Sequence, residues 1–468
     1  MTVSAEREKE TYQLVITRRA ASEILFVETE ASRSLPNLSV VRTERIVEQL
    51  FEMILNNWNL RAHCFGIRRP IAENRGTHQG FAIFDAFDST SEPRPGMVWL
   101  NVAALGLPSA RVSCESLCLV QAALKELASQ NNNTAFGHFG RPGWVGQLFD
   151  WAEAQIDPFG YQLTGRFRQF NGNATSCLIR LETTGPAVWF KAPGAENGQE
   201  LAITESLATW FPASLPRMIA VHRDWNGWLA FDAPGSSLEQ VADIALWVRV
   251  ARALAELQIA SIAKCPDLVA VGCRDLSLPT MIRLIDPFLV RLAVCMECQG
   301  PETPSRLGRA EFAVLADALQ DSLHRLQEIR LPPTLSHMDL NGGNVICSQE
   351  QCVFLDWAEA AVSTPLTTFE FLRELAKRSR IRGYGGSVRI NAAYLRPWRE
   401  LISPDDLAEG LTYSPLVAVF TYALACDHRG KQSGQDSPGR AQFLRALTRR
   451  MYQEALKQRS SPCRVSQP

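Results

Sequence analysis

Short runs of alternating hydrophobic and polar residues fill the amino-terminal part of the chain, a pattern typical of half-buried strands. The strand-like runs lie at residues 12–30, 63–67, 80–84 and 97–100. Apolar residues recur at helical spacing in 42–57 and 113–129. Asparagines and glycines between 131 and 146 then break the pattern and indicate a loop. We therefore predict a compact α/β domain over residues 1–135.

A linker over residues 136–160 contains the next amphipathic helix, at 144–156. A second group of strands follows within 161–235, together with one helix at 198–210. These strands are expected at residues 161–170, 177–183, 187–191, 218–221 and 227–232. Turn residues separate them, so the pattern predicts a small antiparallel sheet with one helix.

Helical spacing dominates from residue 236 to residue 457. Helices are expected at 238–260, 278–298, 309–329, 366–381, 404–426 and 437–457. A strand–loop–strand segment at 334–362 interrupts them, and a polar tail covers 458–468. Strands followed by a largely helical region indicate an α+β fold class for residues 161–457.

Net charge, apolar runs and cysteine content limit the partners and the cellular location that we expect for this protein. The chain has 48 basic and 49 acidic residues, a net charge of -1 that gives no electrostatic support for nucleic-acid or membrane binding. No apolar run is long enough to span a membrane, and the polar start MTVSAEREKETYQ lacks the apolar core of a signal peptide. Twelve scattered cysteines are typical of reduced thiols. We expect a cytoplasmic protein.

The segment at 334–357 combines the residues that phosphoryl transfer needs. Asp339 follows an apolar run and would accept the proton of an attacking hydroxyl. Asn344 precedes the short strand Val345-Ile346-Cys347, and Asp356 ends the return strand Cys352 to Leu355. In such a hairpin the two oxygen-bearing side chains flank the same end, where both could bind one Mg²⁺. A surface hairpin with chance polar residues is the alternative.

At this point the resemblance to a known family is plain. HMDLNGGNVICSQEQCVFLDWAEA resembles the catalytic segment of the aminoglycoside phosphotransferase family, which is related to choline kinases and more remotely to protein kinases. The resemblance covers roughly residues 160–450. It implies a bilobal protein-kinase-like fold, Asp339 as the catalytic base, Asn344 and Asp356 as Mg²⁺ ligands, and a structural role for His337. It also implies ATP as the phosphate donor.

The small sheet should then hold the nucleotide. Lys191 ends the apolar strand at 187–190, where its cation would meet the α- and β-phosphates. We expect Glu205, on the following helix, to be its ion-pair partner, with Glu200 as the alternative.

Two further segments of this region are candidates for nucleotide contacts. The loop from Phe170 to Ser176, with Asn171 and Gly172, lies where the phosphate-covering loop belongs, although an ordinary Asn-Gly hairpin turn is an equal alternative. Phe231 and Asp232 lie where backbone groups of the hinge would pair with adenine.

The residue before Asp339 indicates a small acceptor rather than a protein. Protein kinases place an arginine there, whereas this chain has Met338. We therefore expect a small-molecule hydroxyl acceptor. The acidic residues Asp405, Asp406, Glu409 and Asp427 could bind an amine of that acceptor, although helix capping or a solvated face is the simpler explanation. A catalytically weak, pseudokinase-like scaffold that acts through the amino-terminal domain is the alternative function.

The strand order of residues 12–105 weakly resembles a Nudix-like domain. The helix that would bind its metals offers Glu44, Glu48 and Glu52 without the adjacent glutamates that the Nudix motif needs. The domain should therefore be catalytically silent. It could bind substrate, brace the kinase-like part or mediate a homodimer, which the sequence leaves open.

Overall fold

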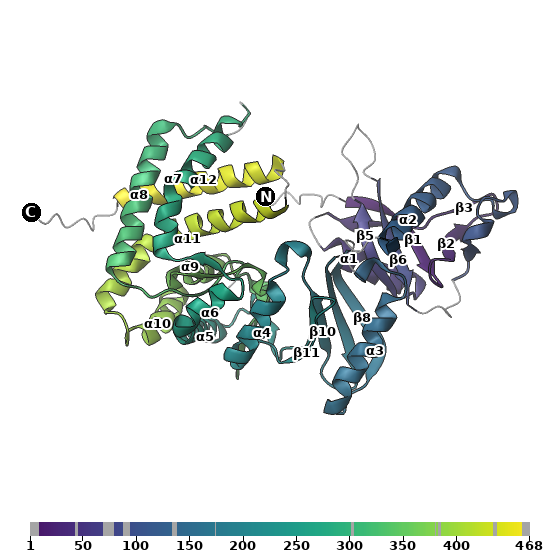
Figure 1. Ribbon diagram of the computed structural model, residues 1–468, viewed down its shortest axis with the longest axis horizontal. Coiled ribbons are helices and arrows are strands. Elements are labelled where there is room, and N and C mark those ends of the chain that lie inside the picture. The colour runs from purple at the N-terminus through teal and green to yellow at the C-terminus, as the bar shows by residue number, and fades with distance from the viewer. Residues whose placement is uncertain are drawn as a thin grey trace, which may run out of the picture. The chain divides into compact units, whose positions relative to one another are not determined.

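The computed structural model (Figure 1) describes residues 9–460 apart from a set of gaps, and the chain divides into two compact units. The gaps are residues 43–44, 69–78, 88–93, 133–137, 174, 301–303, 380, 382–384 and 434–437. The first unit comprises 1–201 and 217–232, and the second comprises 202–216 and 233–468.

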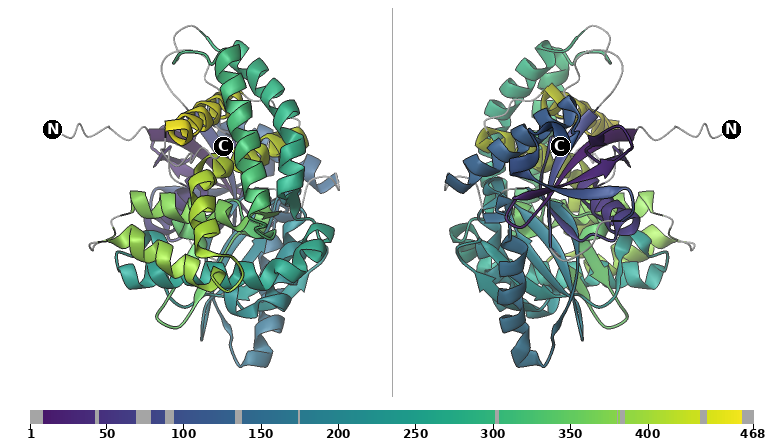
Figure 2. Two further views of the ribbon diagram at one scale, coloured as in Figure 1. Left: turned by 90° about the vertical axis from the view of Figure 1, so that its left-hand side faces the viewer. Right: turned by 90° about the vertical axis from the view of Figure 1, so that its right-hand side faces the viewer.

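The first unit begins with a mixed seven-stranded sheet, drawn as purple arrows in Figure 2. Its strands are β1 (Lys9–Arg18), β2 (Glu23–Glu28), β3 (Arg33–Ser34), β4 (Asn37–Val41), β5 (Ala62–Arg68), β6 (Gln79–Ala86) and β7 (Met97–Asn101). β1 runs parallel to β6 and antiparallel to β2 and β4. Helix α1 (Ile46–Trp58) packs on one face and helix α2 (Cys114–Asn132) on the other.

Alternation along β1 explains the two faces of this sheet. Leu14 and Ile16 are buried in the core that includes Leu50 and Ile54 of α1. Val15, between them, is buried in the core that includes Val120 of α2. A strand whose two faces are both covered has no solvated side. Both faces of β1 are therefore buried, one in the core that includes α1 and the other in the core that includes α2.

A five-stranded antiparallel sheet completes the first unit. Its strand order is β11-β12-β10-β9-β8. The bounds are β8 (Leu163–Gly172), β9 (Cys177–Thr183), β10 (Val188–Ala192), β11 (Met218–His222) and β12 (Gly227–Phe231). Helix α3 (Trp144–Ile156) precedes the sheet and helix α4 (Glu200–Trp210) follows β10. The five strands and the single following helix are those expected from the sequence.

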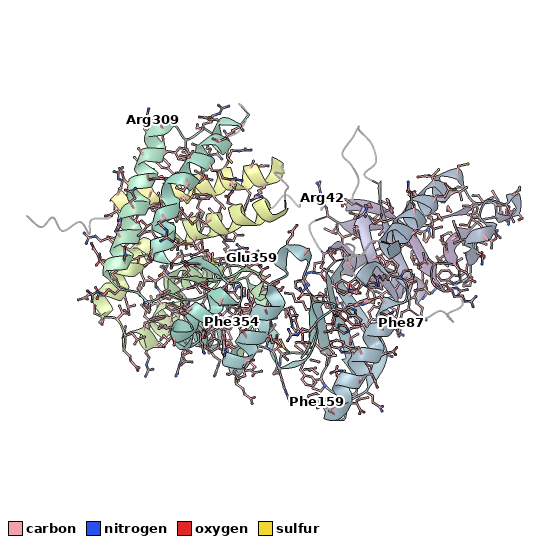
Figure 3. All side chains as sticks on the ribbon, viewed as in Figure 1. Arg42, Phe87, Phe159, Arg309, Phe354 and Glu359 are labelled. Carbon is pink, nitrogen blue, oxygen red and sulfur yellow. The ribbon has the colours of Figure 1, made fainter. Side chains whose placement is uncertain are left out.

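The two sheets of the first unit share a core. Phe51 of α1 lies 5.2 Å from the ring of Phe167 on β8, and Phe87, labelled in Figure 3, stacks 4.6 Å from Phe149 of α3. Gln169 of β8 is fully buried. Its side chain accepts from the backbone N–H of Cys64 at 2.7 Å and donates to the carbonyl of Cys64 at 3.2 Å.

A charged contact accompanies this shared core. Arg168 of β8 pairs with Glu48 at 2.8 Å and with Glu52, so two of the glutamates in the Nudix comparison bind an arginine of the second sheet. The Nudix-like nature of residues 12–105 and their separate folding stay predictions.

The second unit is mostly helical. Besides residues 202–210 of α4, its helices are α5 (Ile244–Ser261), α6 (Cys265–Ala270), α7 (Leu278–Glu297), α8 (Arg309–Glu328), α9 (Pro365–Arg378), α10 (Gly386–Trp398), α11 (Pro404–Ser433) and α12 (Pro438–Ser460). They enclose a core with Trp247, Phe369, Phe420 and Phe354, the last labelled in Figure 3.

Two small sheets lie among these helices. One has the order β13-β16-β17 and the other β14-β18-β15. Their strands are β13 (Ser236–Ser237), β14 (Arg274–Leu276), β15 (Thr334–His337), β16 (Val345–Cys347), β17 (Cys352–Phe354) and β18 (Ala360–Ser363). β16 and β17 form the hairpin expected within the interruption at 334–362.

Strand β4 and helix α10 were not expected from the sequence. α10 begins after Gly385, which has a φ of 75°, and contains Pro397 near its end. Only Ile390, Tyr394 and Trp398 of α10 are buried, at spacings of four residues. Tyr394 stacks on Phe369 at 3.7 Å and donates to Gln258 at 2.6 Å. Tertiary packing therefore stabilises a segment whose glycine and proline favour a turn.

In the part of the chain that the structure describes, no helix is both long and apolar enough to cross a bilayer.

Candidate active site

Strand β15 leads directly into the loop that carries Asp339. The residue before it, Met338, is 1% exposed, whereas Asp339 is half-buried. β15 pairs antiparallel with β18, which places its end at His337 opposite Ala360. A buried strand thus holds the start of the loop and leaves the carboxylate accessible.

The hairpin places Asn344 and Asp356 at the same end. β16 and β17 pair through Val345 with Phe354, and the N–H of Leu355 donates to the carbonyl of Asn344 at 2.8 Å. Asp356 follows Leu355 with a φ of 62°, in the left-handed region that aspartate tolerates better than most residues. The left-handed backbone turns the chain at the position where the side chain of Asp356 emerges exposed.

Asparagine side chains fix the loop between these carboxylates. Asn341 accepts from the N–H groups of Gly343 at 2.9 Å and Asn344 at 3.1 Å, which caps the short helical turn 342–344. The side-chain amide of Asn344 donates to the carbonyl of Asp339 at 2.9 Å. That bond orients the Asn344 amide, so its oxygen points away from Asp339 and can serve as a metal ligand.

His337 supports the loop from beneath. It is 2% exposed, and its ring Nε2 lies 2.7 Å from the carbonyl of Leu355. A carbonyl only accepts, so Nε2 carries the proton. The ring also lies 4.6 Å from that of Trp357, whose indole donates to the carbonyl of Phe354 at 3.1 Å. His337 thus joins the end of β15 to the end of β17, which is a structural role.

Gly342 has no room for a side chain, and we expect Gly342→Ala to destabilise the protein. A Cβ there would lie 2.7 Å from the Cβ of Glu239 and 2.8 Å from its backbone nitrogen. Overpacking against backbone should lower the free energy of unfolding by about 1–3 kcal/mol. Chemical denaturation measures the change.

Gly146, inside helix α3, provides the matched control. A Cβ there meets nothing within 4 Å. Gly146→Ala should therefore raise the free energy of unfolding by about 0.5–1 kcal/mol, since alanine favours a helix. Equal effects of the two substitutions would contradict the close contact at Gly342.

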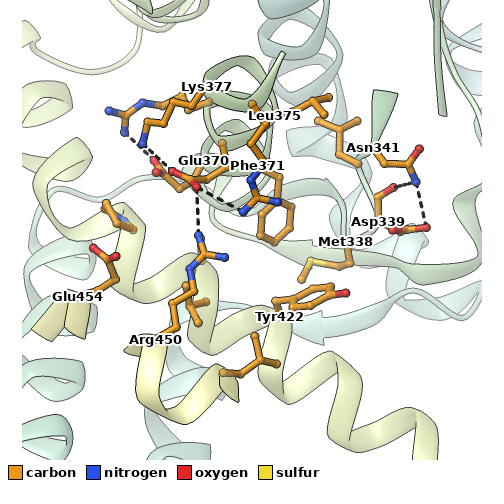
Figure 4. Close-up of a pocket in the computed structure, with 18 of the residues that line it drawn as sticks. Met338, Asp339, Asn341, Glu370, Phe371, Leu375, Lys377, Tyr422, Arg450 and Glu454 are labelled. Carbon is orange, nitrogen blue, oxygen red and sulfur yellow. Dashed lines mark hydrogen bonds and ion pairs between the residues drawn. The ribbon is translucent and has the colours of Figure 1, made fainter. Parts of the chain in front are cut away.

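Asp339 opens onto a pocket of about 730 Å³ within the second unit (Figure 4). Its apolar and aromatic lining includes Met338, Phe371, Val419, Tyr422 and Phe443. Burial, with Cys426 and Asp339 nearby, raises the pKa of Tyr422 to about 12. Tyr422 therefore stays protonated at neutral pH, and its ring forms one wall beside the Asp339 carboxylate.

Charged side chains of α9 and α12 line the rest of the pocket, and they were not predicted from the sequence. These residues are Glu370, Arg373, Glu374, Lys377, Arg378, Arg450, Glu454 and Lys457. They come from helices about eighty residues apart in the chain, so no local spacing joins them.

The acidic residues suggested from the sequence as amine ligands, Asp405, Asp406, Glu409 and Asp427, do not line this pocket. Asp406 accepts from Ser403 at 2.7 Å, at the start of α11. Asp427 is 4% exposed and pairs with Arg291 at 2.5 Å. The capping explanation therefore fits Asp406, and Asp427 is a buried ion-pair residue.

Lys191 is the last residue but one of β10 (Val188–Ala192), near the strand end expected for it, and it forms an ion pair with Glu200. The ammonium lies 2.5 Å from the Glu200 carboxylate, which is 1% exposed. This ion pair is the one that the sequence offered as the alternative to Glu205. Glu200 is the first residue of α4, and a residue five positions later points roughly 140° away around a helix. Glu205 is half-buried further along the same helix.

The described residues of the candidate phosphate-covering loop, which exclude 174, include the last pairs of a strand ladder. Asn171 pairs with Leu178 and Gly172 with Cys177, so both belong to the strand ladder. The side chain of Asn173 accepts from the N–H of Ser176 at 2.9 Å. A Cβ on Gly172 would clash with the side-chain amide of Gln169, so local packing explains a glycine at this position. A phosphate contact here stays a prediction.

The candidate hinge residues also have structural contacts. The N–H of Phe231 donates to the carbonyl of Arg217 at 2.9 Å, and that of Asp232 to the carbonyl of Ala187 at 2.8 Å. The Asp232 carboxylate accepts from Arg180 and Trp189, both at 2.9 Å. These two N–H groups already have acceptors, so a hydrogen bond from adenine would have to be accepted by carbonyl oxygens of this segment. An adenine contact here stays a prediction.

Comparison with known proteins supports the resemblance drawn from the catalytic loop. The model of the phosphotransferase enzyme family matches residues 229–369, which include Asp339, Asn344 and Asp356. The family resemblance is thereby confirmed for this stretch, and the α+β layout agrees with the fold expected from it. No curated protein matches the sequence.

Several solved structures are distantly similar. Macrolide 2'-phosphotransferase MphH from Brachybacterium faecium is 17% identical, over 64% of this chain and 97% of its own, with a TM-score of 0.44. A choline/ethanolamine kinase family protein from Mesorhizobium loti is 15% identical over 67% and 95%, with a TM-score of 0.43. Choline kinase from Cryptosporidium parvum is 13% identical over 67% and 95%, with a TM-score of 0.45. These likenesses are too distant to bear on activity.

Proposed function

We propose that this protein transfers the γ-phosphate of ATP to a hydroxyl group of a small molecule. The observation that carries the proposal is the hairpin end. It places Asn344 and Asp356 at one end of the hairpin, with Asn344 in contact with the carbonyl of Asp339, in a segment that matches a phosphotransferase family model. Phosphoryl transfer depends mainly on positioning and on stabilising negative charge, and this set of residues supplies both.

Asn344 and Asp356 fit a magnesium ion by the chemistry of their donors. Both offer hard oxygen ligands, and the Nδ2 bond of Asn344 to the Asp339 carbonyl leaves its Oδ1 for a metal. Among the residues that the structure describes, no group of three or more His, Cys, Asp or Glu is placed to hold a metal. Two side chains suffice here, because Mg²⁺ in such sites keeps phosphate and water as its other ligands. When bound, the ion would neutralise charge on the phosphates.

Asp339 is the proposed base. Its half-buried carboxylate faces the pocket, where an acceptor hydroxyl can approach it. It orients that hydroxyl and accepts its proton as the oxygen attacks the γ-phosphorus. The Asn341 amide lies 3.5 Å from one Asp339 oxygen, a distance that holds the carboxylate only weakly.

Lys191 is the proposed contact to the nucleotide phosphates. Glu200 is buried, and the ion pair at 2.5 Å fixes the direction of the long lysine side chain. The side chain of Lys191 remains 22% exposed, so the ammonium can reach a ligand. An ordered cation loses less entropy when a phosphate binds to it.

Stabilisation by Mg-ATP tests the proposal. A ligand that binds only the folded state at a hundred times its Kd should raise the free energy of unfolding by about 2.7 kcal/mol, and removing Mg²⁺ should remove most of that gain. ADP formation should follow when amino alcohols, sugars, macrolides or aminoglycosides are added. No stabilisation, together with ADP formation no faster than in Asp339→Ala, would instead support the pseudokinase-like scaffold.

A further inference from the structure

The pocket beside Asp339 has two chemically different ends. In Figure 4, Asp339 and Asn341 lie on one side, and Lys377, Arg450 and Glu454 lie on the other. Met338, Phe371 and Tyr422 lie between the two ends. An acceptor with its hydroxyl at Asp339 would therefore pass an apolar, aromatic wall before it meets the charged side chains.

The carboxylates at the charged end are already paired with cations. Glu370 is 4% exposed and accepts from Arg373 at 2.6 Å and from Ser414 at 3.2 Å. Glu454 pairs with Lys457, on its own helix, at 2.7 Å. An amine on the acceptor would have to displace a cation of the protein from either carboxylate, which gains little.

Glu374 is shared by three cations. Its carboxylate lies 2.6 Å from Lys377, 3.3 Å from Arg450 and 3.7 Å from Arg378. Although burial acts to raise it, these neighbours hold the pKa of Glu374 below its usual value. One negative charge among three positive charges leaves a local excess of two.

The cations have donors to spare for a ligand. A guanidinium carries five N–H groups and an ammonium three, whereas one carboxylate pairs with all three of these side chains and accepts a hydrogen bond from Lys377. Arg450 and Lys377 are 41% and 52% exposed, so both side chains are accessible from solvent. Arginine forms paired hydrogen bonds with carboxylate or phosphate oxygens.

We propose that the acceptor is an anionic alcohol: its hydroxyl lies at Asp339, an apolar body lies against Phe371 and Tyr422, and a carboxylate or phosphate binds Arg450 and Lys377. The inference rests on the proposed function, because it uses Asp339 as the end that receives the hydroxyl. It selects acceptors with a negative group over the amine-bearing acceptors that the sequence suggested.

Three benzyl alcohols of one shape test the charge preference. They are 4-(hydroxymethyl)benzoate, its primary amide and 4-(hydroxymethyl)benzylamine, titrated calorimetrically into the intact protein with Mg²⁺ and a non-hydrolysable ATP analogue. The benzoate should bind at least about tenfold more tightly than either of the others, and its affinity should fall as salt screens the cations. Equal affinities, no measurable binding of the benzoate, or a preference for the ammonium would overturn the inference.

Two variants assign the effect to the cations. Arg450→Gln and Lys377→Gln should each weaken binding of the benzoate by about tenfold and leave the amide unchanged. Arg252→Gln is the control, because Arg252 also pairs with a glutamate at 2.7 Å but does not line the pocket. If both pocket variants bind the benzoate as wild type does, the assignment fails. The proposed function is judged separately, by ADP formation that depends on Asp339.

Discussion

Replacing Asp339 with asparagine should lower kcat for phosphoryl transfer by roughly a thousandfold, the usual contribution of a positioned general base. Asparagine keeps the size of the side chain and its contacts with the loop, but it cannot accept the hydroxyl proton. The loop geometry depends on the carbonyl of Asp339, which Asn344 contacts at 2.9 Å, and not on the carboxylate alone. Affinity for Mg-ATP should therefore change little, and the loss should fall on kcat.

Steady-state kinetics with an acceptor found by screening, together with calorimetric titration of Mg-ATP, measures both parts of this prediction. Asp405→Asn is the matched control, since Asp405 is exposed at the start of α11 and does not line the pocket. A variant at 339 that keeps most of its kcat would remove Asp339 from the role of base. If the variant also loses affinity for Mg-ATP, then Asp339 acts through nucleotide binding rather than through the acceptor hydroxyl.

Phe51→Ala should destabilise the first unit by about 3–5 kcal/mol, a large share of the stability of a typical domain. Phe51 is 1% exposed, and its ring packs on Phe167 of the five-stranded sheet. The cavity would lie in the core that the two sheets share. Loss of packing there should weaken both sheets together.

Chemical denaturation followed by Trp fluorescence measures this effect. Leu107 is 56% exposed in the same unit, so Leu107→Ala serves as the control and should change stability by less than about 0.5 kcal/mol. If Phe51→Ala unfolds the seven-stranded sheet but leaves the affinity for Mg-ATP unchanged, then the two sheets do not unfold as one cooperative unit.

Local pattern was enough to predict the hairpin that carries Asn344 and Asp356. Asp339, Asn344 and Asp356 lie within eighteen residues, and the two strands between them are short apolar runs joined by a polar turn. Apolar runs and turn chemistry decide such a segment without any distant contact. The five strands of the second sheet were predicted for the same reason.

Features that depend on tertiary contacts were not predicted. Glu200 and Glu205 lie on one helix, and only the packed structure shows that Glu200 is buried against Lys191. The charged end of the pocket joins Glu374 to Arg450 across two helices that no spacing relates. Helix α10 is stabilised by tertiary packing. Its own glycine and proline favour a turn, so the local sequence did not predict a helix there.

Because the backbone at Asp356 is left-handed, a substitution at this position affects both the folding of the turn and the proposed metal site. Under the proposed function, a residue at that position would have to bind a metal as well as tolerate a φ of 62°. Asparagine or glycine would keep the turn while weakening or removing the ligand, whereas alanine or valine would strain the turn too. A descendant of this chain that abandoned catalysis could therefore stay folded most easily with Asn or Gly at 356. Those two residues, in a related sequence, would mark a lineage that kept the scaffold and gave up the reaction.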